Sequence, residues 1–181
     1  MKKRVFIGSF VKIPGFNREY PRIKKEFGGI LAGRWIPERN FHITYRFLGD
    51  ISLDEISNIR AVLKDKLKGS ISVDIKFKGL GAFPNLANPR VFFIQVEDTS
   101  GNLQEISRFI NQKLALLGYP DEKRLFKPHI TLKRIKHVER DQFLRKIKSY
   151  ENKLFGIQKE IKIDIVESIL KPEGAVYKPV E

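Results

Sequence analysis

Two short segments of this sequence carry the same three residues, His-Ile-Thr, at positions 42–44 and 129–131. The chain holds only three histidines and three threonines, so two of each in one arrangement is improbable under independent placement. Imidazole gives and takes protons near neutral pH, and a threonine hydroxyl can hydrogen-bond a phosphate oxygen. In-line displacement at phosphorus needs a base on one side and an acid on the other. The repeated segment therefore predicts a two-histidine site for phosphoester chemistry.

Each repeated segment is predicted to lie on a β-strand, because β-branched and aromatic residues surround the first histidine and β-branched residues the second. Residues two apart on a strand point to the same face, so His42 projects with Thr44, and His129 with Thr131. If the two strands meet, two histidines and two threonines come together in pseudo-symmetric positions.

Three cations close to the motifs are candidates for binding the substrate. If alternation continues, Arg46 shares the face of His42, and Lys133 shares the face of His129. Arg134 stands at the end of its strand, where alternation can fail. With 35 Lys and Arg in the chain, a cation near any site is also expected by chance.

Apolar periodicity and the positions of Gly and Pro predict helices and strands along the whole chain. The predicted strands are residues 3–10, 40–48, 71–79, 90–96, 128–135, 160–170 and 175–180. The predicted helices are residues 16–30, 52–67, 99–117 and 139–150, with Ser52 and Thr99 as N-caps of the second and third.

The two halves of the chain share one order, in which a strand bearing His-Ile-Thr leads shortly into a helix. The two histidines lie 87 positions apart, which suggests an internal duplication. We therefore expect an α+β fold of two pseudo-symmetric, intertwined lobes, forming a single domain over residues 1–181. Each lobe is expected to be an antiparallel sheet with outer helices, and the lobes are expected to face each other across a central cleft.

The composition bounds the class of partner. A formal charge of +14 favours a polyanion, with nucleic acid as the leading class, although a solubilising basic surface is the alternative. The absence of Cys excludes disulfides, thiolate chemistry and Cys-based zinc sites. The first apolar stretch, residues 5–11, is too short for a signal sequence or a membrane span, so we expect a cytoplasmic protein. We also expect a monomer. Abundant Lys and Glu with one Met and no Cys indicates a thermophilic origin.

In this context the paired segments resemble the H-x-T-x signatures of 2H phosphoesterases, specifically the RNA 2′,3′-cyclic phosphodiesterases, also called 2′-5′ RNA ligases. The resemblance spans nearly the whole chain and is carried by residues 4–7, 42–49, 81–84, 89–91, 128–134 and 168–177. One departure is Tyr45, where the family usually has Leu; we expect this side chain to face the core.

The resemblance implies an activity and the roles of four residues. His42 would be the proton donor and His129 the proton acceptor, while Thr44 and Thr131 hold the phosphate. The implied reaction is RNA processing by a hydrolase: a 2′,3′-cyclic phosphate end becomes a 2′-phosphate, without metal or nucleotide cofactor. RNA with such ends, tRNA-like fragments included, is the implied partner, and the reverse reaction would form a 2′-5′ linkage.

Other functions stay open at this point. The chain could be a basic RNA-binding module without catalysis, or a phosphodiesterase for small cyclic nucleotides. A zinc site with His137 as third ligand is disfavoured, because no H-x-H or H-E-x-x-H spacing is present and His137 is expected beyond its strand. The basic helix 139–150 is interpreted as a solvated face rather than an RNA groove. The side chains of Phe10, Phe83 and Phe126 could stack on a base, but core packing is the favoured interpretation.

Overall fold

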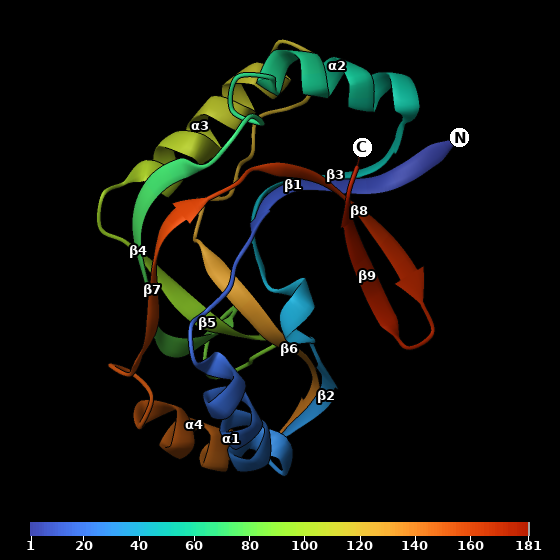
Figure 1. Cartoon of the computed structure of the whole chain (residues 1–181). Coiled ribbons are helices and arrows are strands. Elements are labelled where there is room, and N and C mark those ends of the chain that lie inside the picture. Colours follow the sequence, from blue (N-terminus) through green and yellow to red (C-terminus); the bar gives the residue numbers. More distant parts are fainter. Residues whose placement is uncertain (181) are drawn as a thin grey trace.

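The computed structural model describes residues 1–180 (Figure 1), in which four α-helices surround two antiparallel sheets. The strands are β1 (Lys2–Phe10), β2 (Leu31–Trp35), β3 (His42–Ser52), β4 (Ile71–Phe83), β5 (Val91–Asp98), β6 (His129–Val138), β7 (Leu154–Ile161), β8 (Asp164–Lys171) and β9 (Gly174–Pro179). The helices are α1 (Phe16–Gly28), α2 (Leu53–Leu63), α3 (Asn102–Ala115) and α4 (Arg140–Lys148), with a short 3₁₀ turn, η1, at Glu38–Asn40. The predicted α+β class with two antiparallel sheets and outer helices is confirmed.

The two sheets have equivalent strand orders. The four-stranded sheet runs β3-β1-β8-β9, and the five-stranded sheet runs β2-β6-β5-β4-β7, so that β2 is an addition outside β6. The histidine strand of each motif therefore pairs with the equivalent neighbour: β3 with β1, and β6 with β5. This agreement is what a duplicated structural unit predicts.

Helices cross between the two halves. Helix α1 follows β1 of the four-stranded sheet, yet it packs on the five-stranded sheet, where Phe27 lies 4.8 Å from Phe92 between ring centroids. Helix α3 follows β5 of the five-stranded sheet, yet it contacts α2 and β3. Figure 1 shows α1 with α4 at one end of the molecule and α2 with α3 at the other. The buried apolar residues form one continuous cluster, so both sheets share a core.

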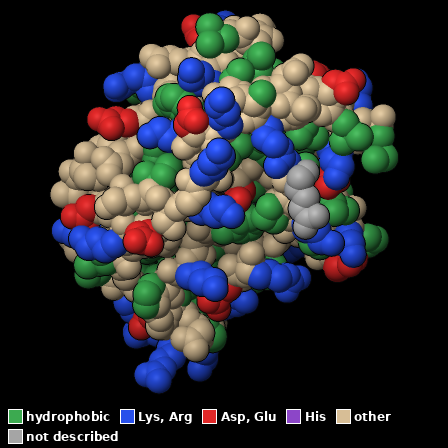
Figure 2. Space-filling model, turned by 45° about the horizontal axis from the view of Figure 1, so that its top comes forward, with side chains coloured by type: hydrophobic (Ala, Val, Ile, Leu, Met, Phe, Trp, Pro, Cys, Tyr) green, Lys and Arg blue, Asp and Glu red, His purple; other side chains and the backbone are tan. Residues whose placement is uncertain are grey.

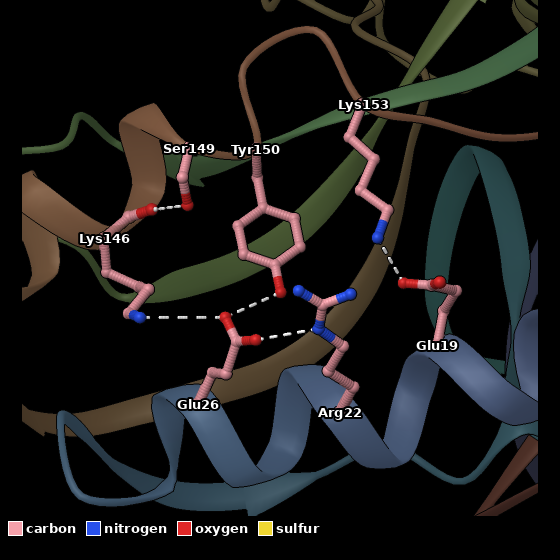
Figure 3. Close-up of polar contacts among 7 residues, drawn as sticks. All are labelled: Glu19, Arg22, Glu26, Lys146, Ser149, Tyr150 and Lys153. Carbon is pink, nitrogen blue, oxygen red and sulfur yellow. Dashed lines mark hydrogen bonds and ion pairs between the residues drawn. The ribbon is translucent and has the colours of Figure 1, made fainter.

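A polar network joins α1 to the segment from α4 to β7 on the outer side (Figure 3). Glu26 accepts hydrogen bonds from Arg22 Nε at 2.9 Å and from the Tyr150 hydroxyl at 2.8 Å, and it pairs with Lys146 at 3.8 Å. The hydrogen bond from Arg22 is the main reason that the pKa of Glu26 lies below its usual range. Part of the positive charge of α4 is thus neutralised within the protein.

The two predicted helix caps had different outcomes. The Ser52 cap is confirmed, because Glu55 N–H donates to Ser52 Oγ at 3.2 Å and Ser52 N–H donates to the Glu55 carboxylate at 2.8 Å. The Thr99 cap is wrong: α3 begins at Asn102, and Asp98 accepts from its first amides. A carboxylate is the stronger acceptor there, and its negative charge suits a helix N-terminus.

Two strands were missed or displaced in the sequence prediction. Strand β2 was not predicted, since its five residues include Gly33 and three exposed positions. The predicted strand 160–170 is wrong in its bounds, because β7 ends at Ile161 and the chain then crosses to the other sheet as β8. Within residues 1–180 no helix has the length and hydropathy needed to span a membrane.

Candidate active site

His42 and His129 are the first residues of β3 and β6, and their rings are held in the same way. Nδ1–H of His42 donates to the Asn40 carbonyl at 2.6 Å, and Nδ1–H of His129 donates to the Lys127 carbonyl at 2.7 Å. A carbonyl oxygen only accepts, so Nδ1 carries the proton in both neutral rings. Each imidazole therefore keeps Nε2 for chemistry.

Aromatic side chains surround both imidazoles. The ring of His42 lies 4.7 Å from Phe6 and 4.9 Å from Tyr177, which meets it edge-on. The ring of His129 lies 4.8 Å from Phe83, again edge-on. Removal from water disfavours the charged form, so burial lowers the pKa of both histidines. Both rings are accordingly biased toward the neutral state in the free protein.

The two histidine strands come together in space. Strands β3 and β6 are in contact although they belong to different sheets. After burial, the charge of His129 is among the causes that lower the pKa of His42, and the charge of Arg134 is another. The three groups are therefore close enough to interact electrostatically, as one shared site requires.

The first residues of each motif follow the predicted alternation. Ile43 and Ile130 are fully buried, whereas the histidines and Thr44 and Thr131 are half-buried on the opposite face. Each threonine thus lies beside its histidine. Tyr45 faces the core as expected, and its hydroxyl lies 3.0 Å from Ser9 Oγ.

Alternation then fails in both strands, at the same motif position. On β3 the register moves from Gly8 opposite Thr44 to Ile7 opposite Arg46, so Tyr45 is an extra residue. On β6 it moves from Phe93 opposite Thr131 to Phe92 opposite Lys133, so Leu132 is the extra residue. A bulge reverses the facing of every residue after it.

The prediction that Arg46 and Lys133 share the face of the histidines is therefore wrong. Arg46 is buried and donates to Asn111 Oδ1 at 2.9 Å and to the Pro120 carbonyl. Lys133 is buried, donates to the Leu31 carbonyl, and lies 4.2 Å above the Trp35 ring.

These two buried cations form reciprocal braces. Arg46, from the first motif, holds the segment that leads into His129, through the carbonyl of Pro120. Lys133, from the second motif, holds the carbonyl of Leu31, in the segment that leads toward His42. Each cation thus ties its own strand to a segment that precedes the other histidine in the sequence.

The same bulges move a different pair onto the histidine face. Arg134 follows the bulge of β6, pairs with Val91 and is exposed. The equivalent residue on β3 is Phe47, which pairs with Phe6 and stacks on it at 5.6 Å. Of the three candidate cations, Arg134 alone lies at the site.

Several residues near the histidines were not predicted. Tyr177 of β9 contacts His42, and the side chain of Asn40 donates to the Ala175 carbonyl at 2.7 Å, which ties β9 to the start of β3. The only sequence signal was the position of Tyr177 within a segment that carried the family resemblance. Pairing of β9 with β8 is long-range information that local patterns do not contain.

His137 does not lie where it was expected. It belongs to β6, and its Nε2 is 3.1 Å from the Glu139 carboxylate. It lies eight positions beyond His129 along β6, or roughly 26 Å away. Of the aromatic candidates, Phe83 contacts His129 and Phe10 lies 6.4 Å from His42, whereas Phe126 packs on Tyr45.

Comparison with known proteins supports the resemblance of the motifs. Residues 21–181 match the family described as "AKAP7 2'5' RNA ligase-like domain". The "RNA 2',3'-cyclic phosphodiesterase" of Aquifex aeolicus is 33% identical over 179 residues, which cover 98% of this chain and 95% of that protein. The protein of the same name from Archaeoglobus fulgidus is 31% identical, over 86% of each chain.

This chain belongs to the 2H phosphoesterase family. Its fold agrees with solved structures. TT0787 of Thermus thermophilus superposes with a TM-score of 0.76 at 24% identity, over 98% of this chain and 95% of that one. Escherichia coli LigT, solved in complex with 3'-AMP, superposes with a TM-score of 0.71 at 16% identity, over 100% and 97%. At these identities the structural matches show the shared fold of the 2H phosphoesterase.

Proposed function

We propose that this 2H phosphoesterase hydrolyses the 2′,3′-cyclic phosphate ends of RNA to 2′-phosphates, with His129 as base and His42 as acid. The observation that carries the proposal is the pair of imidazoles. Both are fixed by an Nδ1–H bond to a carbonyl, both keep Nε2 available, and they are close enough for the charge of one to act on the other. The names of the relatives support the choice of substrate.

The reaction follows from the two Nε2 atoms. Nε2 of His129 takes a proton from water, and the resulting hydroxide attacks phosphorus opposite the 3′ oxygen. The bond from phosphorus to the 3′ oxygen breaks, and Nε2–H of His42 protonates that oxygen. The carbonyl acceptors at Nδ1 hold each ring in place and favour its doubly protonated form. His42 begins the reaction in this form, and His129 reaches it when it takes the proton from water.

Three side chains would hold the nonbridging phosphate oxygens. Thr44 and Thr131 offer hydroxyls beside the two histidines, and Arg134 offers a guanidinium on the same face. Hydrogen bonds aimed at the charge that develops on these oxygens lower the barrier most effectively. The positive charge of Arg134 lowers the pKa of His42. A bound phosphate is negative, so it has the opposite effect and raises that pKa. Substrate binding would thus help to charge the acid.

The surface charge suits an RNA partner. Figure 2 shows Lys and Arg side chains scattered over the visible face and outnumbering the acids, in line with the formal charge of +14. The same two groups, working in reverse, would join a cyclic-phosphate end to a 5′-hydroxyl as a 2′-5′ linkage. Fragments of tRNA as substrates, a cytoplasmic location and a monomeric state stay predictions from the sequence.

The test is incubation of the protein with an RNA oligonucleotide ending in a 2′,3′-cyclic phosphate, in excess chelator. The expected product is a 2′-phosphate, identified by phosphorus NMR against 2′- and 3′-phosphate standards. A 3′-phosphate product, or loss of activity on chelation, would contradict the proposal. Salt-sensitive RNA binding without any product would instead identify a binding module.

A further inference from the structure

Two arginines face each other across neighbouring strands of the five-stranded sheet. Arg34 of β2 lies directly opposite Arg134 of β6 in the antiparallel ladder. Directly opposite residues project to the same face, with Cβ atoms about 5 Å apart. The next pair along, Trp35 opposite Lys133, occupies the other face, where the two side chains contact each other. Arg34 therefore shares the face that carries the histidines.

Gly33 explains how β2 presents Arg34 in this register. The register between β2 and β6 shifts between Ala32 and Gly33, and Gly33 has a φ of +138°. A Cβ atom at this position would lie 2.1 Å from the carbonyl oxygen of Arg134. Only glycine permits this approach and this backbone conformation, and the following residue then meets Arg134 directly.

The facing arginines lack a counterion within the protein. Like charges directly opposite on paired strands repel. Both side chains are exposed, and among residues 1–180 neither has a carboxylate within 4.0 Å. The partner described for Arg34 is a neutral one, the Pro172 carbonyl at 3.0 Å. A guanidinium has five N–H donors, so most of the donors of Arg34 are available to an anion.

We infer that Arg34 binds a second phosphate of the RNA, the phosphodiester that joins the cyclic-phosphate nucleotide to the rest of the chain. This inference rests on the proposed function. Arg134 is the arginine nearer the histidines and meets the cyclic phosphate. Arg34 stands one strand farther out, on the edge strand β2, about 4.8 Å away. An RNA chain supplies one phosphate per nucleotide, so two adjacent guanidiniums match two consecutive phosphates. The site therefore favours oligonucleotides over cyclic mononucleotides.

The first experiment compares two substrates that differ in the second phosphate: a trinucleotide with a 2′,3′-cyclic phosphate end and the corresponding cyclic mononucleotide. Arg34→Met should lower the ratio of kcat/KM for the trinucleotide to kcat/KM for the mononucleotide about tenfold, which is the effect of losing one charge-assisted contact. Arg34→Lys should retain part of the ratio, because it keeps the charge but not the fork of donors. Arg140→Met is the matched control, since Arg140 is exposed on α4 beyond the opposite face of the sheet; its ratio should equal that of the wild type.

A second experiment removes the charge from the RNA instead. A trinucleotide with a neutral methylphosphonate in place of that phosphodiester should be about tenfold worse for the wild type. In Arg34→Met, the methylphosphonate should not lower kcat/KM any further, because the variant and the modified RNA each remove the same interaction.

Three results separate the outcomes. An unchanged ratio in Arg34→Met, or indifference of the wild type to the methylphosphonate, would overturn the inference. An unchanged ratio that comes from an equal loss on both substrates counts in the same way, because Arg34 would then act on a part that both substrates share and not on the second phosphate. A wild type that turns over neither substrate would refute the proposed function itself, which is a different failure.

Discussion

The two histidine strands, β3 and β6, share the features that position their first residues and differ at one exposed position after the bulge. Each begins with a histidine whose Nδ1–H binds the carbonyl two residues earlier, continues with a threonine, and bulges one residue later. Each then buries a cation that braces a segment before the other histidine. The shared features are those that a symmetric acid–base pair needs.

The difference between the strands lies at one equivalent position, Phe47 on β3 and Arg134 on β6. Phe47 stacks on Phe6, which itself contacts His42, whereas Arg134 adds a positive charge that acts on His42. A cation next to one side of the site and an aromatic ring on the other make two similar halves unequal. Under the proposed function, the half that contains β6 and Arg134 is therefore the one suited to hold phosphate charge.

The largest expected effect tests the feature that the strands share most closely. His42→Ala and His129→Ala should each lower kcat by about 10²- to 10⁴-fold, because each removes one proton-transfer group. Circular dichroism and thermal melting should match the wild type, and His137→Ala should keep the wild-type rate. Wild-type turnover in both His42→Ala and His129→Ala would end the assignment.

The buried braces should matter next, through stability. Lys133→Met leaves the buried Leu31 carbonyl without its donor, and Arg46→Met removes the hydrogen bonds of a buried guanidinium to Asn111 and Pro120. Each change should cost about 1–3 kcal/mol of unfolding free energy. Urea denaturation measures this directly, with Arg140→Met as the exposed control. If either brace variant unfolds at the wild-type midpoint, the hydrogen bonds to Pro120 or Leu31 contribute no net stability.

The threonines should contribute less than the histidines. Thr44→Val and Thr131→Val keep the side-chain shape but remove the hydroxyl that is proposed to bind phosphate, so kcat/KM should fall about tenfold in each. Thr99→Val, far from both motifs in the sequence, serves as control. A loss confined to one of the two variants would show that the halves differ in phosphate binding as well as in charge.

The smallest effect sharpens the difference between Phe47 and Arg134. The charge of Arg134 lowers the pKa of His42, so Arg134→Met should raise that pKa, while Phe47→Leu removes no charge and should leave it in place. With a higher pKa, His42 stays protonated to higher pH, and the alkaline limb that it controls moves upward. Proton NMR titration of the histidines measures the pKa itself. A fall, or no change, in Arg134→Met would contradict the sign.

Local sequence patterns were sufficient for the parts of the site that depend on one strand at a time. The pairing of each histidine with a threonine two residues later, and the burial of Ile43 and Ile130 between them, follow from alternation alone. The facing of Arg46, Lys133 and Arg134 did not follow, because a bulge depends on how a strand pairs with its neighbour.

The amino-acid sequence by itself determined the chemistry available to this protein: two identical His-Ile-Thr segments, a strong positive charge and no thiol. Only the tertiary structure decided which cations reach the histidines and which brace the backbone. The physical reason is that side-chain identity and period are local properties, whereas register, bulges and the exchange of helices between sheets arise from contacts among distant segments. The arginine pair on β2 and β6 is the clearest case, since Arg34 and Arg134 meet across 100 positions of the chain.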